Sequence, residues 1–171
     1  ATCECVQIMK LPFISKEQLV VGVDIGSHSV KVCELKKSDK GYHILSLGSA
    51  MLPEDAVDDG TLNDAEAVGA VIADLFKNLK IKNKKVGFSI SGYSVIVKKV
   101  NLAVMDEEQL EEHIMLEAEQ YIPFDISDVY LDFQDLKTNR EDSDRTDVML
   151  VAAKKEIVDD YLDMLRANNL Q

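Results

Sequence analysis

The residues best suited to chemistry lie in one short segment near the beginning of the chain, Val21-Gly22-Val23-Asp24-Ile25-Gly26-Ser27-His28-Ser29-Val30-Lys31. An apolar run of strand length ends in the carboxylate of Asp24, the chain turns at Gly26, and a second run carries Lys31. Such a turn can direct backbone N–H groups at an anion, and glycine lets a phosphate approach closely. Ser27 and Ser29 would add hydroxyl donors, Lys31 a compact positive charge, and Asp24 an oxygen for Mg²⁺, usually through water.

The short Asp-x-Gly pattern has an ordinary structural explanation as well, because a tight hairpin with a polar tip would carry the same residues. No G-x-x-x-x-G-K-[ST] string occurs, so the segment is not a Walker loop. The three histidines, His28, His43 and His113, are scattered and have no neighbouring nucleophile or ligand spacing. We therefore assign no catalytic residue from the sequence.

The elements that would position this segment form a small α/β unit over residues 19–92. Apolar runs at Leu19–Asp24, Val30–Leu35 and Tyr42–Ala50 predict three strands joined by short turns, which is typical of an antiparallel meander. A helix capped by Asn63 or Asp64 should follow, with an apolar stripe of helical spacing: Val68, Val71, Ile72, Leu75 and Leu79. Alternation at Val86, Phe88 and Ile90 predicts a fourth strand. This order is that of a ribonuclease-H-like sheet.

A second pattern begins after Ser91-Gly92 and predicts a second unit over residues 93–171. The pattern predicts a strand from Tyr93 to Leu102. Asp106, with Gln109 as its capping-box partner, begins a helix that Pro123 ends. Apolar alternation over 129–133 and 148–152, on either side of the charged loop 138–146, predicts a hairpin. A last helix carries Ile157, Tyr161 and Leu165, and residues 1–18 are left as an N-terminal extension.

Composition excludes several classes of function. The chain has 171 residues, 46% of them hydrophobic, which is enough for a buried core, and a formal net charge of −12. Acidic surfaces repel nucleic acid and anionic lipid, so we expect neither as a direct partner. The basic run Lys80, Lys82, Lys84 and Lys85 is interpreted as a solvated helix end.

Cysteine usage and hydropathy favour a reducing cytoplasm. The three cysteines, Cys3, Cys5 and Cys33, are odd in number and lack framework spacing. No apolar run approaches the ~20 residues of a membrane span, and the first ten residues do not resemble a signal peptide. If the protein acts at a membrane, a partner must bring it there.

Two sets of motifs resemble known families. The segment from Asp24 to Lys31 matches every position of the first phosphate motif of actin, heat-shock chaperones and sugar kinases. The helical segment Glu117-Ala118-Glu119-Gln120-Tyr121-Ile122-Pro123-Phe124 is similar to the E-A-E-Q-Y-I-P-F motif of the PilM family of type IV pilus assembly. Asp128–Phe133, Ser27–Glu34 and Val148–Lys154 extend this likeness, which runs from about Leu19 to the end of the chain. We expect Tyr121, Ile122 and Phe124 to pack the helix end rather than to touch a ligand.

The resemblance implies an architecture and a set of ligands. A ribonuclease-H-like, actin-type subdomain (1A, residues 19–92) would carry an inserted, FtsA-like subdomain (1C, also called SHS2, residues 93–171) with a strand-helix-strand-strand order. ATP and Mg²⁺ would bind between two lobes of the complete protein. The phosphates would contact four residues, Gly26, Ser27, Ser29 and Lys31, and Asp24 would face the metal.

The resemblance also implies partners and a location. The N-terminal cytoplasmic tail of PilN would dock the protein under the inner membrane, with other pilus inner-membrane components nearby, in support of pilus biogenesis and twitching motility. Homo-oligomerisation stays open. The second phosphate motif and the adenosine-binding residues of the family lie beyond Gln171, so we expect this chain to bind nucleotide weakly or not at all, and the complete protein to be at most a slow ATPase. The alternatives are an FtsA-like cell-division ATPase and the cytoplasmic domain of a type II secretion assembly protein.

Overall fold

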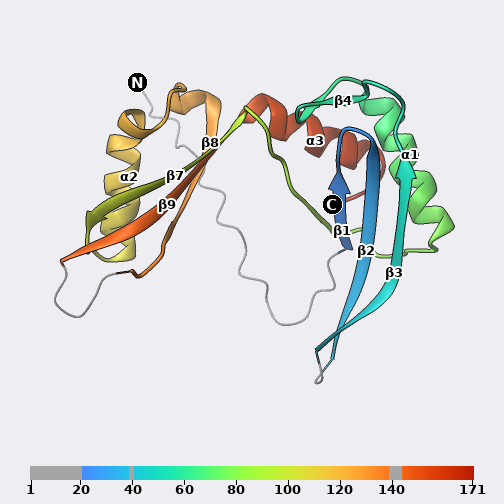
Figure 1. The fold of residues 1–171 in the computed structure, drawn as a ribbon, viewed down its shortest axis with the longest axis horizontal. Helices are drawn as coiled ribbons and strands as arrows, with labels where there is room; N and C mark the ends of the chain where they lie inside the picture. The colour runs from blue at the N-terminus through green and yellow to red at the C-terminus, as the bar shows by residue number, and fades with distance from the viewer. Residues whose placement is uncertain (1–20, 39–40, 139–143) are drawn as a thin grey trace. The chain divides into compact units, whose positions relative to one another are not determined.

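The computed structural model describes residues 21–38, 41–138 and 144–171, which form two compact units (Figure 1). The first unit contains the described residues up to Tyr93 together with Ile157–Gln171, and the second unit spans Ser94–Glu156. The predicted extension over residues 1–18, with Cys3 and Cys5, lies outside the described residues. The chain is an α/β protein, as predicted.

The first unit is built on a four-stranded sheet with the strand order β3-β2-β1-β6. Strands β1 (Val21–Ile25), β2 (Ser29–Ser38) and β3 (Gly41–Met51) form the predicted antiparallel meander. Strand β6 (Val86–Phe88) lies parallel to β1 on the other side. Parallel neighbours end at the same edge of a sheet, so the residues that follow β1 and β6 come together there.

Two helices supply the rest of the core of the first unit. Helix α1 (Ala65–Asn78) begins at Asp64, whose carboxylate accepts a hydrogen bond from the Ala67 N–H at 2.9 Å. Helix α3 spans Lys155–Ala167. The core combines side chains of both helices with alternate residues of β1 and β2: Val21, Val23, Val30, Val32, Val68, Ile72, Leu75, Phe76, Tyr161, Met164 and Leu165. The opposite face of the sheet lies away from this core.

The last helix belongs to the first unit, which corrects the sequence-based grouping of residues 157–171 with the second unit. Tyr161 is 2% exposed, and its ring stacks on that of Phe88 with the centroids 5.8 Å apart. The backbone of Gln171 then pairs beside β6, donating to Lys84 O at 2.8 Å and accepting from Val86 N at 2.7 Å. The sequence pattern specified the apolar stripe of the helix but not the core that the stripe would join.

A close contact between helices accounts for the glycine inside the α1 stripe. A Cβ at Gly69 would collide with the side-chain amide of Asn168, which donates to Met164 O at 2.9 Å. Gly69 therefore lets α1 approach the end of α3. Two very short strands, β4 (Val57–Asp58) and β5 (Thr61–Leu62), precede α1 and were not predicted.

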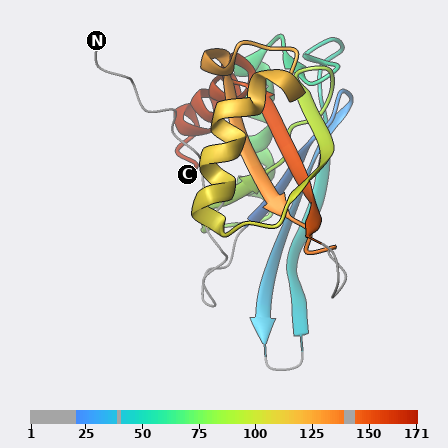
Figure 2. The same cartoon turned by 90° about the vertical axis from the view of Figure 1, so that its left-hand side faces the viewer.

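The second unit is a three-stranded antiparallel sheet, with the order β7-β9-β8, and one helix. Its strands are β7 (Val95–Ala103), β8 (Val129–Asp135) and β9 (Arg145–Lys154), and Figure 2 shows helix α2 (Glu107–Tyr121) lying along the sheet. The predicted hairpin is the β8–β9 pair. A short 3₁₀ turn, η1 (Ile126–Asp128), was not predicted.

Helix α2 begins and ends where the sequence indicated. The Asp106 carboxylate accepts from the Gln109 N–H at 2.9 Å, and the Gln109 side chain accepts from the Asp106 N–H at 3.3 Å, which completes the capping box. The apolar face of the helix packs on the sheet through a group of buried residues: Leu110, Ile114, Ala118, Val129, Leu131, Val148, Leu150 and Ala152. None of the helices in the described residues is long and apolar enough to cross a membrane.

Candidate phosphate-binding site

The turn between β1 and β2 is compact and closed by backbone hydrogen bonds. The Gly26 N–H donates to Ser29 O at 3.1 Å, and the Leu52 N–H donates to His28 O at 2.9 Å. Gly26 does not have a positive φ, and a Cβ built on it would meet only Ser29 O, at an ordinary 3.5 Å. Neither backbone conformation nor internal packing requires glycine here. The missing side chain leaves the turn open to a ligand.

Asp24 and Lys31 face each other across β1 and β2. They are register partners, and Lys31 Nζ lies 2.8 Å from Asp24 Oδ2. Both side chains are about three-fifths exposed, at 60% and 59%. Exposed ion pairs typically contribute ~0–1 kcal/mol, so a bound anion or cation could replace either partner at little cost.

The ion pair borders a hollow of about 440 Å³ on the face of the sheet that lies away from the helices. Because side chains alternate along a strand, Val21 and Val23 enter the core while Gly22 and Asp24 face the hollow. Gly22 is the register partner of Gly87 on β6, so two glycines lie side by side in its lining. The lining residues are Gly22, Val23, Asp24, Lys31, Val32, Cys33, Leu47, Gly87, Phe88 and Ser89.

The structure brings some of the predicted site residues together and leaves others to one side. Asp24 and Lys31 are in contact and share the hollow. Gly26, exposed Ser27 and half-buried Ser29 lie on the adjoining turn and are not part of the lining. The predicted residues are thus divided between the hollow and the turn beside it.

Ser89 is a residue of this site that the sequence analysis missed. It directly follows β6, whose last residue, Phe88, is the register partner of Val23. Ser89 therefore comes level with Asp24, and it lines the same hollow. The signal was present in the sequence, since alternation at Val86, Phe88 and Ile90 places residue 89 on the opposite face.

The hollow offers few side chains that could hold a metal ion. In the part of the chain that the structure describes, no three His, Cys, Asp or Glu side chains gather closely enough to hold a metal. Asp24 is the one acidic residue in the lining of the hollow, so a metal ion bound there would take its other ligands from phosphate oxygens and water. Mg²⁺ is commonly bound through one or two carboxylates plus substrate phosphates.

The motif at the end of α2 has a structural role, as expected from the sequence. Ile122 is 4% exposed, and Tyr121 and Phe124 pack against the core of the second unit. Lys154 Nζ lies 5.0 Å from the centroid of the Phe124 ring. Burial is the largest cause that raises the pKa of Tyr121. The negative charge of Glu117 and the hydrogen bond that the phenol donates to Glu117 raise this pKa further. These contacts fix the turn that leads from the helix toward β8.

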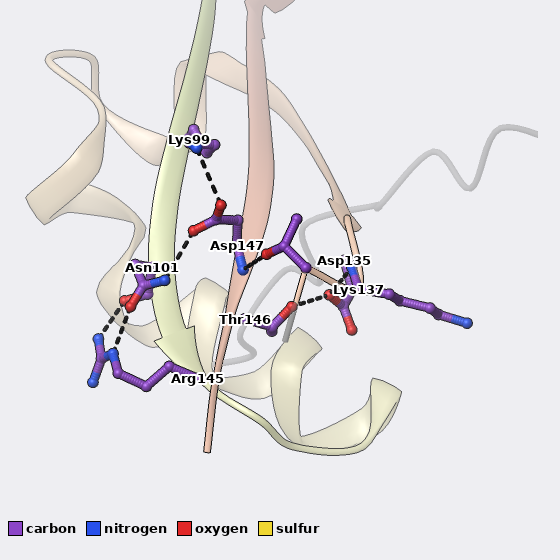
Figure 3. Close-up of polar contacts among 8 residues, drawn as sticks. Lys99, Asn101, Asp135, Lys137, Arg145, Thr146 and Asp147 are labelled. Carbon is purple, nitrogen blue, oxygen red and sulfur yellow. Dashed lines mark hydrogen bonds and ion pairs between the residues drawn. The ribbon is translucent and has the colours of Figure 1, made fainter. Parts of the chain in front are cut away.

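A second polar cluster lies on the sheet of the second unit (Figure 3). The Asp147 carboxylate accepts from Asn101 Nδ2 at 2.8 Å and from Lys99 Nζ at 3.1 Å, and these hydrogen bonds hold the pKa of Asp147 below its usual range. The Asp147 N–H donates to Thr138 Oγ1 at 2.9 Å, and Arg145 donates to both the side-chain and the backbone oxygen of Asn101. The cluster ties β7 to β9 and to the segment after β8.

The same cluster continues through a buried hydroxyl. Thr146 is 3% exposed, and its Oγ1 donates to Asp135 Oδ1 at 2.8 Å. That oxygen also accepts from the Lys137 N–H at 2.8 Å (Figure 3). The donors and acceptors named here are used within the protein, so we assign this cluster to structure rather than to a ligand.

Comparison with known proteins defines first the class and then the family. The fold is an α/β fold that this chain shares with the solved structures similar to it. The family model described as type IV pilus assembly protein PilM matches residues 22–171, and the chain belongs to this family.

Two solved structures show the extent of the likeness. The PilM–PilN type IV pilus biogenesis complex contains a chain that is 28% identical, with a TM-score of 0.79 over 90% of this chain. The cytoplasmic domain of EpsL, an inner-membrane component of the type II secretion system of Vibrio cholerae, is 17% identical, with a TM-score of 0.54 over 90% of this chain, and shows a shared fold alone. This chain covers 45% of the first structure and 54% of the second.

Proposed function

We propose that the protein is a cytoplasmic adaptor of type IV pilus assembly, which binds the N-terminal cytoplasmic segment of PilN and is held under the inner membrane by that partner. The observation that carries the proposal is the similarity to the chain in the PilM–PilN complex, at 28% identity over 90% of this chain. A net charge of −12 supports recruitment by a protein, because an acidic surface is repelled by anionic lipid.

The proposed adaptor carries a nucleotide site, with the first unit as subdomain 1A and the second as subdomain 1C of an FtsA-like protein. The open turn at Gly26 and the hollow beside Asp24 and Lys31 support ATP and Mg²⁺ as ligands. Backbone N–H groups of the turn, with Ser27 and Ser29, would hold the phosphates, Lys31 would neutralise them, and Asp24 would hold water on the metal.

The nucleotide acts in this proposal as a conformational ligand rather than as a rapidly consumed substrate. Among the lining residues of the hollow, Asp24 is the one carboxylate, and Lys31 already pairs with it. A carboxylate engaged with a lysine and with metal-bound water is a poor general base for attack on a phosphate. ATP would then change the affinity for a partner by binding one conformation better than another.

A calorimetric titration tests the adaptor function. A synthetic peptide with the sequence of the PilN N-terminus from the same source is titrated into the complete protein, with a scrambled peptide as control. We expect saturable binding in the micromolar range for the native peptide, about −8 kcal/mol, and none for the scrambled one. Absence of binding by a complete protein that unfolds cooperatively would overturn the PilN assignment.

A second titration tests the nucleotide separately. We expect the complete protein to bind ATP with Mg²⁺ and to release phosphate slowly. Rapid turnover would favour a true ATPase. Peptide binding without any ATP binding would leave an adaptor that has no nucleotide site.

A further inference from the structure

We propose that Ser89 is a nucleotide-binding residue, and that with Lys31 and Asp24 it forms a polar row across three adjacent strands. The proposal rests on the nucleotide site proposed above and extends it to the segment after β6. The first phosphate motif ends at Lys31 and does not include this serine.

Strand register places the three residues in one row. Asp24 on β1 is the antiparallel partner of Lys31 on β2. On the other side of β1, the parallel pairs run from Val21 with Val86 to Val23 with Phe88, so Ser89 is the next residue alongside Asp24. The row therefore crosses β2, β1 and the end of β6 at the carboxyl ends of two parallel strands, where α/β sheets commonly bind ligands.

Side-chain alternation directs all three residues to the same face. Phe88 and Ile90 pack against the core of the first unit, so the intervening Ser89 points away from it, as Asp24 does. All three residues line the hollow of about 440 Å³. The strand register and the lining of the hollow agree on this arrangement.

The rest of the lining makes this row the polar part of the hollow. The remaining lining residues are glycines, aliphatic residues, a phenylalanine and a cysteine: Gly22, Val23, Val32, Cys33, Leu47, Gly87 and Phe88. Gly22 and Gly87 place no side chain in the hollow, because glycine has none. In this lining, the side chains that could interact strongly with the charged oxygens of a ligand are therefore those of the row.

The three side chains have complementary hydrogen-bonding roles. Lys31 only donates, the Asp24 carboxylate only accepts, and the Ser89 hydroxyl can do both. A phosphate group with a hydrated divalent cation needs donors for its oxygens and acceptors for the water on the metal. Ser89 supplies a donor on the side of Asp24 that lies away from Lys31, so a phosphate group held there would be contacted from two sides.

The test uses the complete protein and two serine variants from the same segment. Ser89→Ala removes the hydroxyl in the row. Ser91→Ala, two residues further on, removes an exposed hydroxyl outside the lining and serves as the matched control. The dissociation constant for ATP with Mg²⁺ is measured by calorimetry, and the unfolding midpoint of each variant is measured without nucleotide.

We expect Ser89→Ala to weaken ATP binding roughly tenfold, the usual effect of losing one hydrogen bond to a charged group. Ser91→Ala should bind like the wild-type protein, and both variants should unfold at the wild-type midpoint.

Three results would overturn the proposal, and they have different meanings. Equal ATP affinity of the wild-type protein and Ser89→Ala removes Ser89 from the site but leaves the nucleotide function standing. No ATP binding by the folded wild-type protein removes the nucleotide function and the role of Ser89 with it. An equal loss in Ser91→Ala would also contradict the row, because Ser91 does not line the hollow.

Discussion

Each unit carries an aspartate on a strand that pairs with a lysine of the neighbouring antiparallel strand, but the two aspartates have different surroundings. Asp24 meets Lys31 at 2.8 Å and is 60% exposed. Asp147 meets Lys99 at 3.1 Å and is 22% exposed, because Asn101 and the segment after β8 close around it. The aspartate–lysine pair of the first unit therefore lies in an open site, whereas that of the second unit lies in a closed cluster.

Neighbouring residues account for this difference. Around Asp147, an asparagine, a threonine and an arginine fill the space and use the available donors and acceptors: Asn101, Thr138 and Arg145. Around Asp24, glycines stand on the same strand, on the adjoining turn and on the neighbouring strand: Gly22, Gly26 and Gly87. A closed cluster stabilises the fold, whereas an open one keeps polar groups and space available to a ligand.

The largest expected effect comes from closing the open site. Gly26→Ala adds one methyl group that meets only Ser29 O, at 3.5 Å, so the fold should tolerate it. If the turn holds phosphate, the methyl group occupies ligand space, and ATP affinity of the complete protein should fall by at least ~10-fold while stability changes by less than ~0.5 kcal/mol. Calorimetry and urea unfolding measure the two quantities.

A second glycine serves as the control, because its replacement should lower the stability of the protein. Gly60 has a φ of +79°, and a Cβ there would collide with the carbonyl oxygen of Ser91. Gly60→Ala should therefore lower stability by more than ~1 kcal/mol. Unchanged ATP binding in Gly26→Ala would show that glycine at 26 does not serve a ligand.

The next effect concerns the closed cluster. Thr146→Val keeps the shape of a side chain that is 3% exposed but removes the hydroxyl that donates to Asp135 at 2.8 Å. We expect a loss of about 1–2 kcal/mol in the free energy of unfolding, since a buried hydrogen bond to a carboxylate is lost. Thr146→Ser, which keeps the hydroxyl, should lose less. If valine is tolerated without cost, the cluster does not stabilise the second unit.

A smaller effect depends on pH. The hydrogen bonds from Asn101 and Lys99 lower the pKa of Asp147 in the folded protein, so its ionised form is favoured by folding. This stabilisation is present above the unfolded pKa of about 3.9 and is lost as the pH falls through the lower folded value. The difference in Tm between wild type and Asp147→Asn should be constant above about pH 5 and shrink below about pH 4. A constant difference down to pH 2 would contradict a lowered pKa.

The sequence predicted local structure well because the controlling signals are local. The capping box at Asp106 and Gln109, the stop at Pro123 and the three-strand meander were all found where expected. Period-two alternation correctly predicted the antiparallel β8–β9 pair. Each of these features depends on residues only a few positions apart.

Long-range packing was less accessible from the sequence. Helix α3 follows the second unit along the chain but shares the core of the first, and its amphipathic stripe would suit either. The hollow needs residues 22, 31 and 89 together, which only the strand order brings close. Ser89 was missed for this reason, whereas Asp24 and Lys31 lie within one continuous motif.

The smallest expected effect is the loss of the Asp24–Lys31 ion pair itself. Asp24→Asn and Lys31→Met, alone and together, should each change the free energy of unfolding by less than ~0.5 kcal/mol, because exposed ion pairs contribute little. Urea unfolding of the four proteins gives the coupling energy of the pair. A coupling well above ~1 kcal/mol would mean that Asp24 and Lys31 form a second closed cluster, held for stability as Asp147 is. A coupling near zero, together with weaker ATP binding in both single variants, would mean that the two charges are kept for a ligand.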